Sequence, residues 1–84
     1  MSGKHERTLA AIFTEPVLAN IAWRDVEALF FSLGAETIEG SGSRVLVVLN
    51  GVRAVFHEPH PEKEIGKPAV RAVRRFLRNA GEAP

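Results

Sequence analysis

The spacing of apolar residues along the chain predicts three helices, because in three segments they recur three and four positions apart. The first helix is expected over Ser2–Phe13 and ends before Pro16, since the residue that precedes a proline is pushed out of the α region. The second helix is expected over Ala22–Leu33. The third is expected over Lys67–Ala80, and its buried stripe is formed by Val70, Val73, Phe76, Leu77 and Ala80.

Between the second and third helices the pattern changes to that of a β-hairpin. Arg44–Leu49 and Val52–His57 are rich in β-branched residues, and the intervening Asn50-Gly51 is the preferred pair for a two-residue type I′ turn. A two-residue loop sets the register, so Arg44 is expected directly opposite His57. Because side chains alternate along a strand, one face is apolar throughout and carries Val45, Val47, Leu49, Val52, Ala54 and Phe56.

The opposite face of the hairpin is mixed and suits a sheet surface left open to solvent or to a partner. A short extended segment over Ala35–Glu39, followed by the glycine-rich loop Gly40–Ser43, adds a third strand. The expected fold class is therefore α+β in the order α-α-β-β-β-α, with a three-stranded antiparallel sheet and the helices on one face. The open face is expected to carry Arg44, Leu46, Val48, Arg53, Val55 and His57.

The composition restricts the function classes more than the fold. Eighty-four residues allow one small domain, and the absence of cysteine excludes a disulfide scaffold, a thiol nucleophile and a cysteine-ligated zinc site. No metal site is predicted from His57-Glu58-Pro59-His60, which lacks a third fixed ligand. No stretch of about 18 apolar residues and no apolar segment after the charged N-terminus are present, so neither a transmembrane helix nor a secretory signal is expected. The expected location is the cytoplasm.

The net charge of +1 hides a strong asymmetry. Residues 1–42 contain three basic and six acidic residues, whereas residues 43–84 contain eight basic and four acidic ones. The final helix has five cations and no anion; they are expected mainly on its outer side, where they would attract phosphate. The plainer interpretation is that these cations only form the solvated face of the helix. The five cations are Lys67, Arg71, Arg74, Arg75 and Arg78.

The order of short motifs along the chain resembles the HicA family of mRNA interferase toxins, which pair with HicB antitoxins. The resemblance covers Ile21–Gly81, so residues 21–84 are expected to form a HicA-like RNA-binding toxin domain and residues 1–20 an N-terminal helical extension and connector. It implies a fold similar to the double-stranded RNA-binding domain, mRNA as substrate, a HicB-type antitoxin as partner, and no cofactor. The motifs are Leu33-Gly34-Ala35, Gly42-Ser43-Arg44, Pro59-His60-Pro61 and Ala80-Gly81.

The resemblance also points to a site around Arg44. In the family a histidine follows Gly-Ser, and Arg44 occupies that position here. Metal-independent RNA cleavage needs a base for the ribose 2′-OH proton and an acid for the leaving oxygen. Arginine stays protonated, so Arg44 is expected to bind the phosphate rather than act as the base, with Ser43 donating a hydrogen bond to the same phosphate. His57, opposite Arg44, and His60, at the edge of the same surface, are the candidate proton-transfer groups.

Two functions remain open from the sequence. One is a HicA-like toxin that binds mRNA through Ser43, Arg53 and the basic helix, with cleavage by Arg44, His57 and His60 as a hypothesis. The other is a catalytically silent RNA-binding or protein-interaction module of the same fold, in which His57 simply ends a strand and His60 braces a proline-rich turn. In that second case a partner protein is expected to dock on Leu46, Val48 and Val55.

Overall fold

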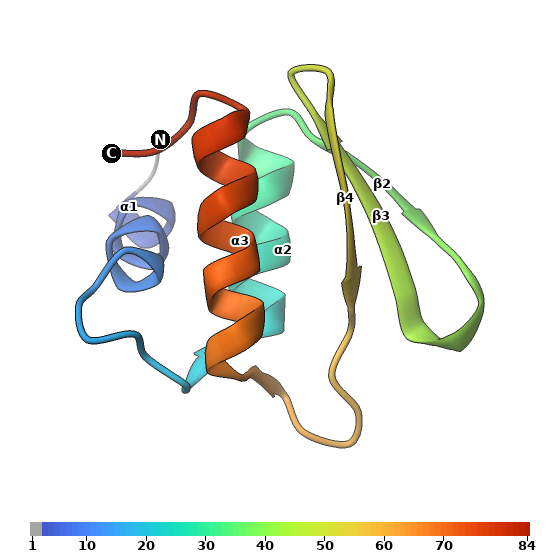
Figure 1. The fold of residues 1–84 in the computed structure, drawn as a ribbon, viewed down its shortest axis with the longest axis horizontal. Helices are drawn as coiled ribbons and strands as arrows, with labels where there is room; N and C mark the ends of the chain where they lie inside the picture. Colours follow the sequence, from blue (N-terminus) through green and yellow to red (C-terminus); the bar gives the residue numbers. More distant parts are fainter. Residues whose placement is uncertain (1–2) are drawn as a thin grey trace.

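The protein has three layers, which lie side by side in Figure 1. The computed structural model describes residues 3–84. Its helices are α1 (Gly3–Ile12), α2 (Trp23–Ser32) and α3 (Lys67–Asn79), and the strands of its main sheet are β2 (Glu36–Glu39), β3 (Arg44–Leu49) and β4 (Val52–His57). The antiparallel sheet, in the order β2-β3-β4, forms one outer layer. Helices α2 and α3 cover one of its faces, and α1 packs against the far side of that helix pair.

The predicted α+β fold and the order α-α-β-β-β-α are confirmed. Element bounds differ from the predicted ones by at most one residue, as is usual at frayed ends; Ser2, the predicted start of the first helix, lies outside the described residues. Three short elements are additional. β1 (Ile21–Ala22) pairs with β5 (Glu64–Ile65), and a 3₁₀ turn, η1 (Ser41–Ser43), joins β2 to β3. A two- or three-residue element has no hydrophobic period from which it could be predicted.

The β3–β4 hairpin has the register that its turn residues predict. Asn50 (φ 52°) and Gly51 (φ 81°) both adopt positive φ, as a type I′ turn requires. Arg44 lies opposite His57 at the other end of the hairpin. The apolar face of the hairpin is turned toward the helices, with Val52 and Ala54 half-buried and Val45, Val47, Leu49 and Phe56 buried.

Aromatic rings join the sheet to the two helices that cover it. Phe56 of β4 packs against Phe30 of α2, with ring centroids 5.6 Å apart, and against Phe76 of α3 at 5.7 Å. Trp23 packs beside Phe56 at 6.3 Å and is buried, whereas Phe31, also on α2, is 80% exposed. The predicted stripe of the final helix is also buried, and it consists of Val70, Val73, Phe76, Leu77 and Ala80.

Arg74 is the exception to the predicted distribution of charge on α3. The sequence predicts it on the outer side with the RNA-binding residues, but only 6% of it is exposed. Its guanidinium donates hydrogen bonds to the main-chain carbonyls of Ile12 and Thr14 and pairs with the carboxylate of Glu15. The last carbonyls of a helix have no intrahelical hydrogen-bond donors. A cation near them also interacts favourably with the negative end of the helix dipole. The predicted outer position of Arg74 is therefore wrong: its guanidinium is held by the end of α1 and by the residues that follow it.

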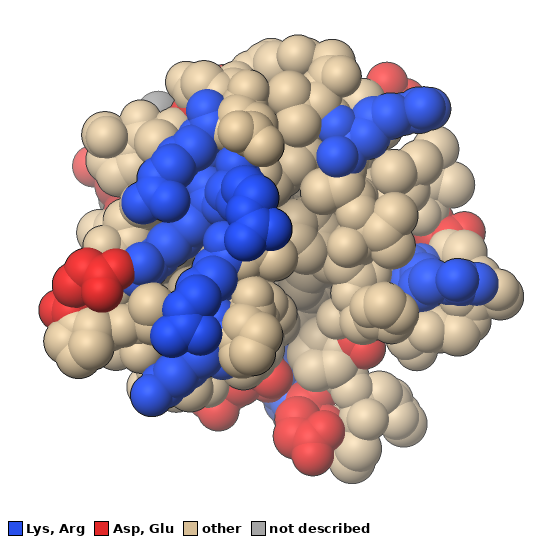
Figure 2. Space-filling view, viewed as in Figure 1, with Lys and Arg blue, Asp and Glu red and all other residues tan. Residues whose placement is uncertain are grey.

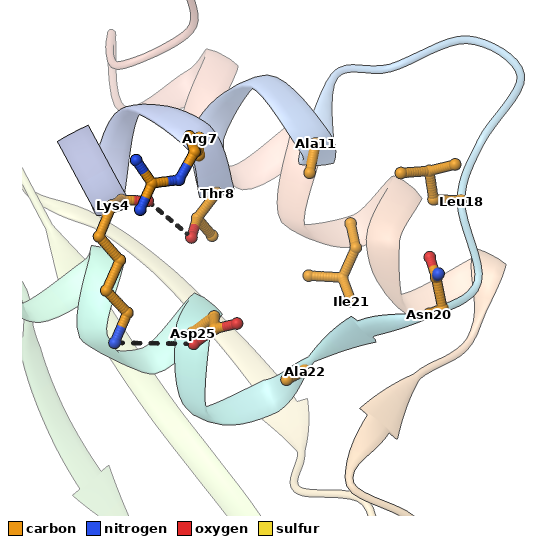
Figure 3. A pocket seen from close by; sticks show the side chains of 9 residues that line it. All are labelled: Lys4, Arg7, Thr8, Ala11, Leu18, Asn20, Ile21, Ala22 and Asp25. Carbon is orange, nitrogen blue, oxygen red and sulfur yellow. Dashed lines mark hydrogen bonds and ion pairs between the residues drawn. The ribbon is translucent and has the colours of Figure 1, made fainter.

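The described part of the N-terminal extension packs as part of the folded domain. Ile12 is 0% exposed, and Lys4 Nζ lies 3.8 Å from Asp25 Oδ1 of α2. Beside that pair, a cavity of about 470 Å³ separates α1 from the chain that leads into α2, as Figure 3 shows. None of the predicted site residues lines this cavity. No helix within residues 3–84 has the length and apolar character needed to cross a bilayer.

Candidate functional site

The open face of the sheet, away from α2 and α3, carries an apolar row across all three strands. Ile38 of β2 lies opposite Leu46 of β3, which lies opposite Val55 of β4; Ile38 and Val55 are each 56% exposed. Val48 and Arg53 pair in the next row. Leu46, Val48 and Val55 thus lie on the predicted face. The sequence does not predict Ile38 as a member, because nothing in it sets the register of a strand of 4 residues, although Ile38 is the one large apolar residue there.

Arg44 and His57 form the pair at the end of the hairpin away from the turn. Both are exposed, so the predicted juxtaposition of the two residues is confirmed at the level of the strand register. The Arg44 guanidinium leans over the 3₁₀ turn, where Nε donates to the Ser41 carbonyl (3.1 Å) and Nη2 to the Ser41 hydroxyl (3.2 Å). These bonds orient the side chain and leave its remaining N–H groups for a ligand, since a guanidinium offers five donors.

Ser43 precedes Arg44 in the left-handed region of backbone space. Its φ is 63°, directly after Gly42 at 69°, a conformation that costs a residue with a Cβ about 1–2 kcal/mol. The Ser43 carbonyl accepts a hydrogen bond of 2.8 Å from the backbone N–H of Glu58, which follows β4. This bond ties the 3₁₀ turn to the far strand of the hairpin. Ser43, Arg44 and His57 are thereby held at one end of the sheet.

The two candidate histidines line different hollows, which meet at Trp23. His60 lines a cavity of about 350 Å³ formed largely by the segment Glu58–Lys63. His57 lines a cavity of about 270 Å³ between β4 and the first half of α3. The structure therefore brings His57 to Arg44 but places His60 in the neighbouring hollow. The path of the loop after β4 depends on tertiary packing. The spacing of His57 and His60 in the sequence therefore does not predict that they line different hollows.

Exposed basic side chains gather over α3 in one patch, which Figure 2 shows in blue. A groove of about 480 Å³ runs between this helix and the connector segment Glu15–Val17. Arg78 lies over the ring of Phe13, with its guanidinium carbon 5.3 Å from the ring centroid, and this contact orients it toward the groove wall. The exposed members of the predicted set on α3 are Lys67, Arg71, Arg75 and Arg78.

Two carboxylates at the same end of the sheet act on a third, that of Glu27. Burial, followed by the charges of Glu58 and Glu39, raises the pKa of the half-buried Glu27 carboxyl above its ordinary value. The group is not a metal site: within residues 3–84 no set of three or more His, Cys, Asp and Glu side chains is placed to hold a metal ion. The raised pKa of Glu27 affects stability, because the ionised form of this carboxyl is disfavoured in the folded protein.

We expect Glu27→Gln to raise the thermal unfolding midpoint at pH 7. The folded protein holds the Glu27 proton more tightly than the unfolded chain does, so its destabilising effect appears as pH rises past the unfolded pKa and is complete above the folded pKa. The gain in the unfolding midpoint should vanish at about pH 3.5, where the Glu27 carboxyl is mostly protonated in both the folded and the unfolded state. Thermal unfolding at both pH values checks this, with the exposed loop substitution Glu62→Gln as control. A gain of equal size at both pH values would contradict it.

Comparison with known proteins identifies a family. A protein-family model described as HicA toxin of bacterial toxin-antitoxin systems matches residues 23–82. The match begins at the start of α2 and runs past the end of α3, so it contains the main sheet, Arg44, His57 and the basic helix, but not α1. Searches of the curated proteins and of the solved structures returned no match.

Proposed function

Because the chain belongs to the HicA toxin family of bacterial toxin-antitoxin systems, we propose that it binds mRNA in the cytoplasm, cleaves it, and is held inactive by a HicB-type antitoxin. The observation that carries the proposal is the exposed Arg44–His57 pair at one end of the open sheet face. His57 of this pair lines the hollow between β4 and α3, and the exposed side of α3 is basic. A phosphodiester bound at Arg44 would therefore have cations along the chain that continues from it.

In the proposed reaction Arg44 and Ser43 hold the scissile phosphate, and His57 accepts the proton of the adjacent ribose 2′-OH. The 2′ oxygen bonds to phosphorus as the bond to the 5′ oxygen breaks, which leaves a cyclic phosphate on one fragment and a 5′-OH on the other. The leaving oxygen takes its proton from His60 or from water. Arg44 stays protonated throughout, so it stabilises the charge that develops on the phosphate oxygens.

The test of this function is induction of the chain alone in a bacterial host, with growth and mRNA integrity measured together. The expected result is growth arrest with fragmented mRNA, both relieved when the protein encoded by an adjacent open reading frame is expressed with it. Normal growth with intact mRNA would contradict the proposal and favour the catalytically silent module. In that event Arg44→His, which restores the histidine of the family motif, shows whether the scaffold remains competent.

The basic groove beside α3 supports RNA binding. We expect Arg71→Ala and Arg75→Ala each to weaken binding of single-stranded RNA and to reduce the slope of log K against log[salt] by about 0.7, the value for one lost phosphate contact. Both side chains line the groove and are exposed. Filter binding or fluorescence anisotropy over a range of salt concentrations measures the slope. Arg7→Ala, an exposed arginine on the other cavity in Figure 3, is the matched control and should leave the slope unchanged.

The apolar row supports an antitoxin surface. We expect Val55→Glu to weaken the complex with the HicB-type partner more than tenfold, because a carboxylate would be desolvated without a partner at the β4 end of the row. The fold should tolerate the change, since Val55 is 56% exposed. Phe31→Glu, which alters an apolar residue that is 80% exposed on α2, is the matched control. Titration calorimetry with the two purified variants decides the point, and equal weakening by both would remove the row from the interface.

A further inference from the structure

A small apolar pocket lies beside His57, between the end of β4 and the first half of α3. Its volume is about 270 Å³. The proposed chemistry uses only the imidazole at its rim, so the rest of the pocket has no assigned role. Exposed His57 and Pro68 form part of its rim, whereas its inner wall includes buried aromatic rings and small helix residues. The residues that form this rim and wall include Trp23, Phe56, His57, Pro68, Ala69 and Ala72.

The β4–α3 pocket is continuous with basic surface. It shares Val55, Phe56 and Ala72 with an adjoining hollow of about 230 Å³, which Arg53 and Arg75 also line. Arg75 in turn lines the groove between α3 and the connector. On its other side the pocket ends at His57, which lies opposite Arg44 in the hairpin. The pocket is thus bordered by Arg53 and Arg75 on one side and by His57 on the other, with Arg44 across the hairpin from His57.

We propose that the β4–α3 pocket binds an unpaired nucleobase of the RNA, adjacent to the phosphate that Arg44 would hold. Single-stranded RNA alternates flat, largely apolar rings with phosphates, and the row of Arg44, the pocket, Arg53 and Arg75 alternates in the same way. Bases of a duplex are stacked inside the helix and cannot enter such a pocket, so the ligand is single-stranded. The inference rests on the proposed function, because it names a subsite of the same RNA surface.

The polar groups that line the pocket favour a nucleobase over an aliphatic side chain as its occupant. Trp23 lines both this pocket and the neighbouring hollow of His60, and its Nε1–H is buried with no hydrogen-bond partner among residues 3–84. A buried donor without an acceptor is unfavourable, and a nucleobase carries ring nitrogens and carbonyl oxygens that accept hydrogen bonds, whereas an aliphatic side chain carries none. At the rim, His57 and Pro68 offer flat surfaces against which a base can stack.

The test compares two short single-stranded oligonucleotides of equal length on the wild-type protein. One is a 2′-O-methyl RNA, which cannot be cleaved through the 2′-OH, and the other has the same phosphates but abasic sugars. Trp23 is the single tryptophan of the sequence, so its fluorescence reports on the pocket. We expect the base-bearing oligonucleotide to change the emission of Trp23 and to bind about tenfold more tightly than the abasic one. Equal binding of the two overturns the base pocket and leaves RNA binding intact, whereas no binding of either overturns the proposed function.

A pocket-filling substitution provides the second arm. Ala69→Leu places a larger side chain in the pocket, and we expect it to lower the affinity for the base-bearing oligonucleotide to that for the abasic one. Ala10→Leu, at an exposed position on α1, is the matched control and should keep the tenfold difference. If Ala69→Leu folds and also keeps that difference, the base binds elsewhere and the assignment is overturned. The comparison of oligonucleotides on the wild type needs no variant to fold.

Discussion

His57→Ala should lower the rate of RNA cleavage by about 10²- to 10⁴-fold, the usual contribution of a positioned general base. Stability should change little, because His57 is exposed and surface substitutions away from special features stay within about 0.5 kcal/mol. The loss arises because the 2′-OH would have to transfer its proton to water, while Arg44, which remains in place, cannot accept it. Single-turnover cleavage of a labelled RNA, with affinity measured separately, separates the chemical step from binding.

His60→Ala is the matched comparison for this prediction. It removes the same side chain from the neighbouring hollow, on the other side of Trp23, and should cost less because water can supply the leaving-group proton. Arg44→Lys keeps the charge but loses the guanidinium bonds to Ser41, so it should weaken phosphate binding more than it alters the pH dependence of cleavage. Undiminished cleavage by folded His57→Ala would remove this histidine from the chemistry.

The hairpin could be predicted in detail because its determinants are local. Asn50-Gly51 sets the turn type, the turn type sets the register, and the register places Arg44 opposite His57 without reference to the rest of the chain. The same logic fails for Ile38. Strand β2 is joined to β3 by the loop Gly40–Ser43, whose conformation the sequence leaves open, so the alignment of the two strands appears only in the structure.

The position of Arg74 could not be predicted for a different reason. The face of α3 that is buried is wider than its apolar stripe, because α1 packs on the flank of α3, and the carbonyls of Ile12 and Thr14 lie far away in the sequence. A charge pattern along one helix contains no information about a second helix that covers it. The separation of His57 and His60 at Trp23 is likewise set by packing of the loop after β4 rather than by sequence spacing.

Arg74→Met is expected to lower the free energy of unfolding by about 2–4 kcal/mol. Methionine retains an apolar stem of similar length, so the change removes mainly the hydrogen bonds to the carbonyls of Ile12 and Thr14. Bonds from a charged donor contribute about 1.5–3 kcal/mol each, and partial access of water to the end of α1 reduces that sum. The pair with Glu15 adds little, since that carboxylate is 71% exposed.

Urea and thermal unfolding followed by the fluorescence of Trp23 measure this loss, which corresponds to a midpoint lowered by roughly 10–25 °C for a domain of this size. Arg75→Met is the matched control, because it makes the same change at the next position of α3 on an exposed side chain. It should leave stability within about 0.5 kcal/mol and weaken RNA binding instead. The two neighbouring arginines would then have different roles: Arg74 holds α1, and Arg75 faces the ligand. Equal stability of the two variants would mean that α1 is held by its apolar contacts alone, with Ile12 as the anchor.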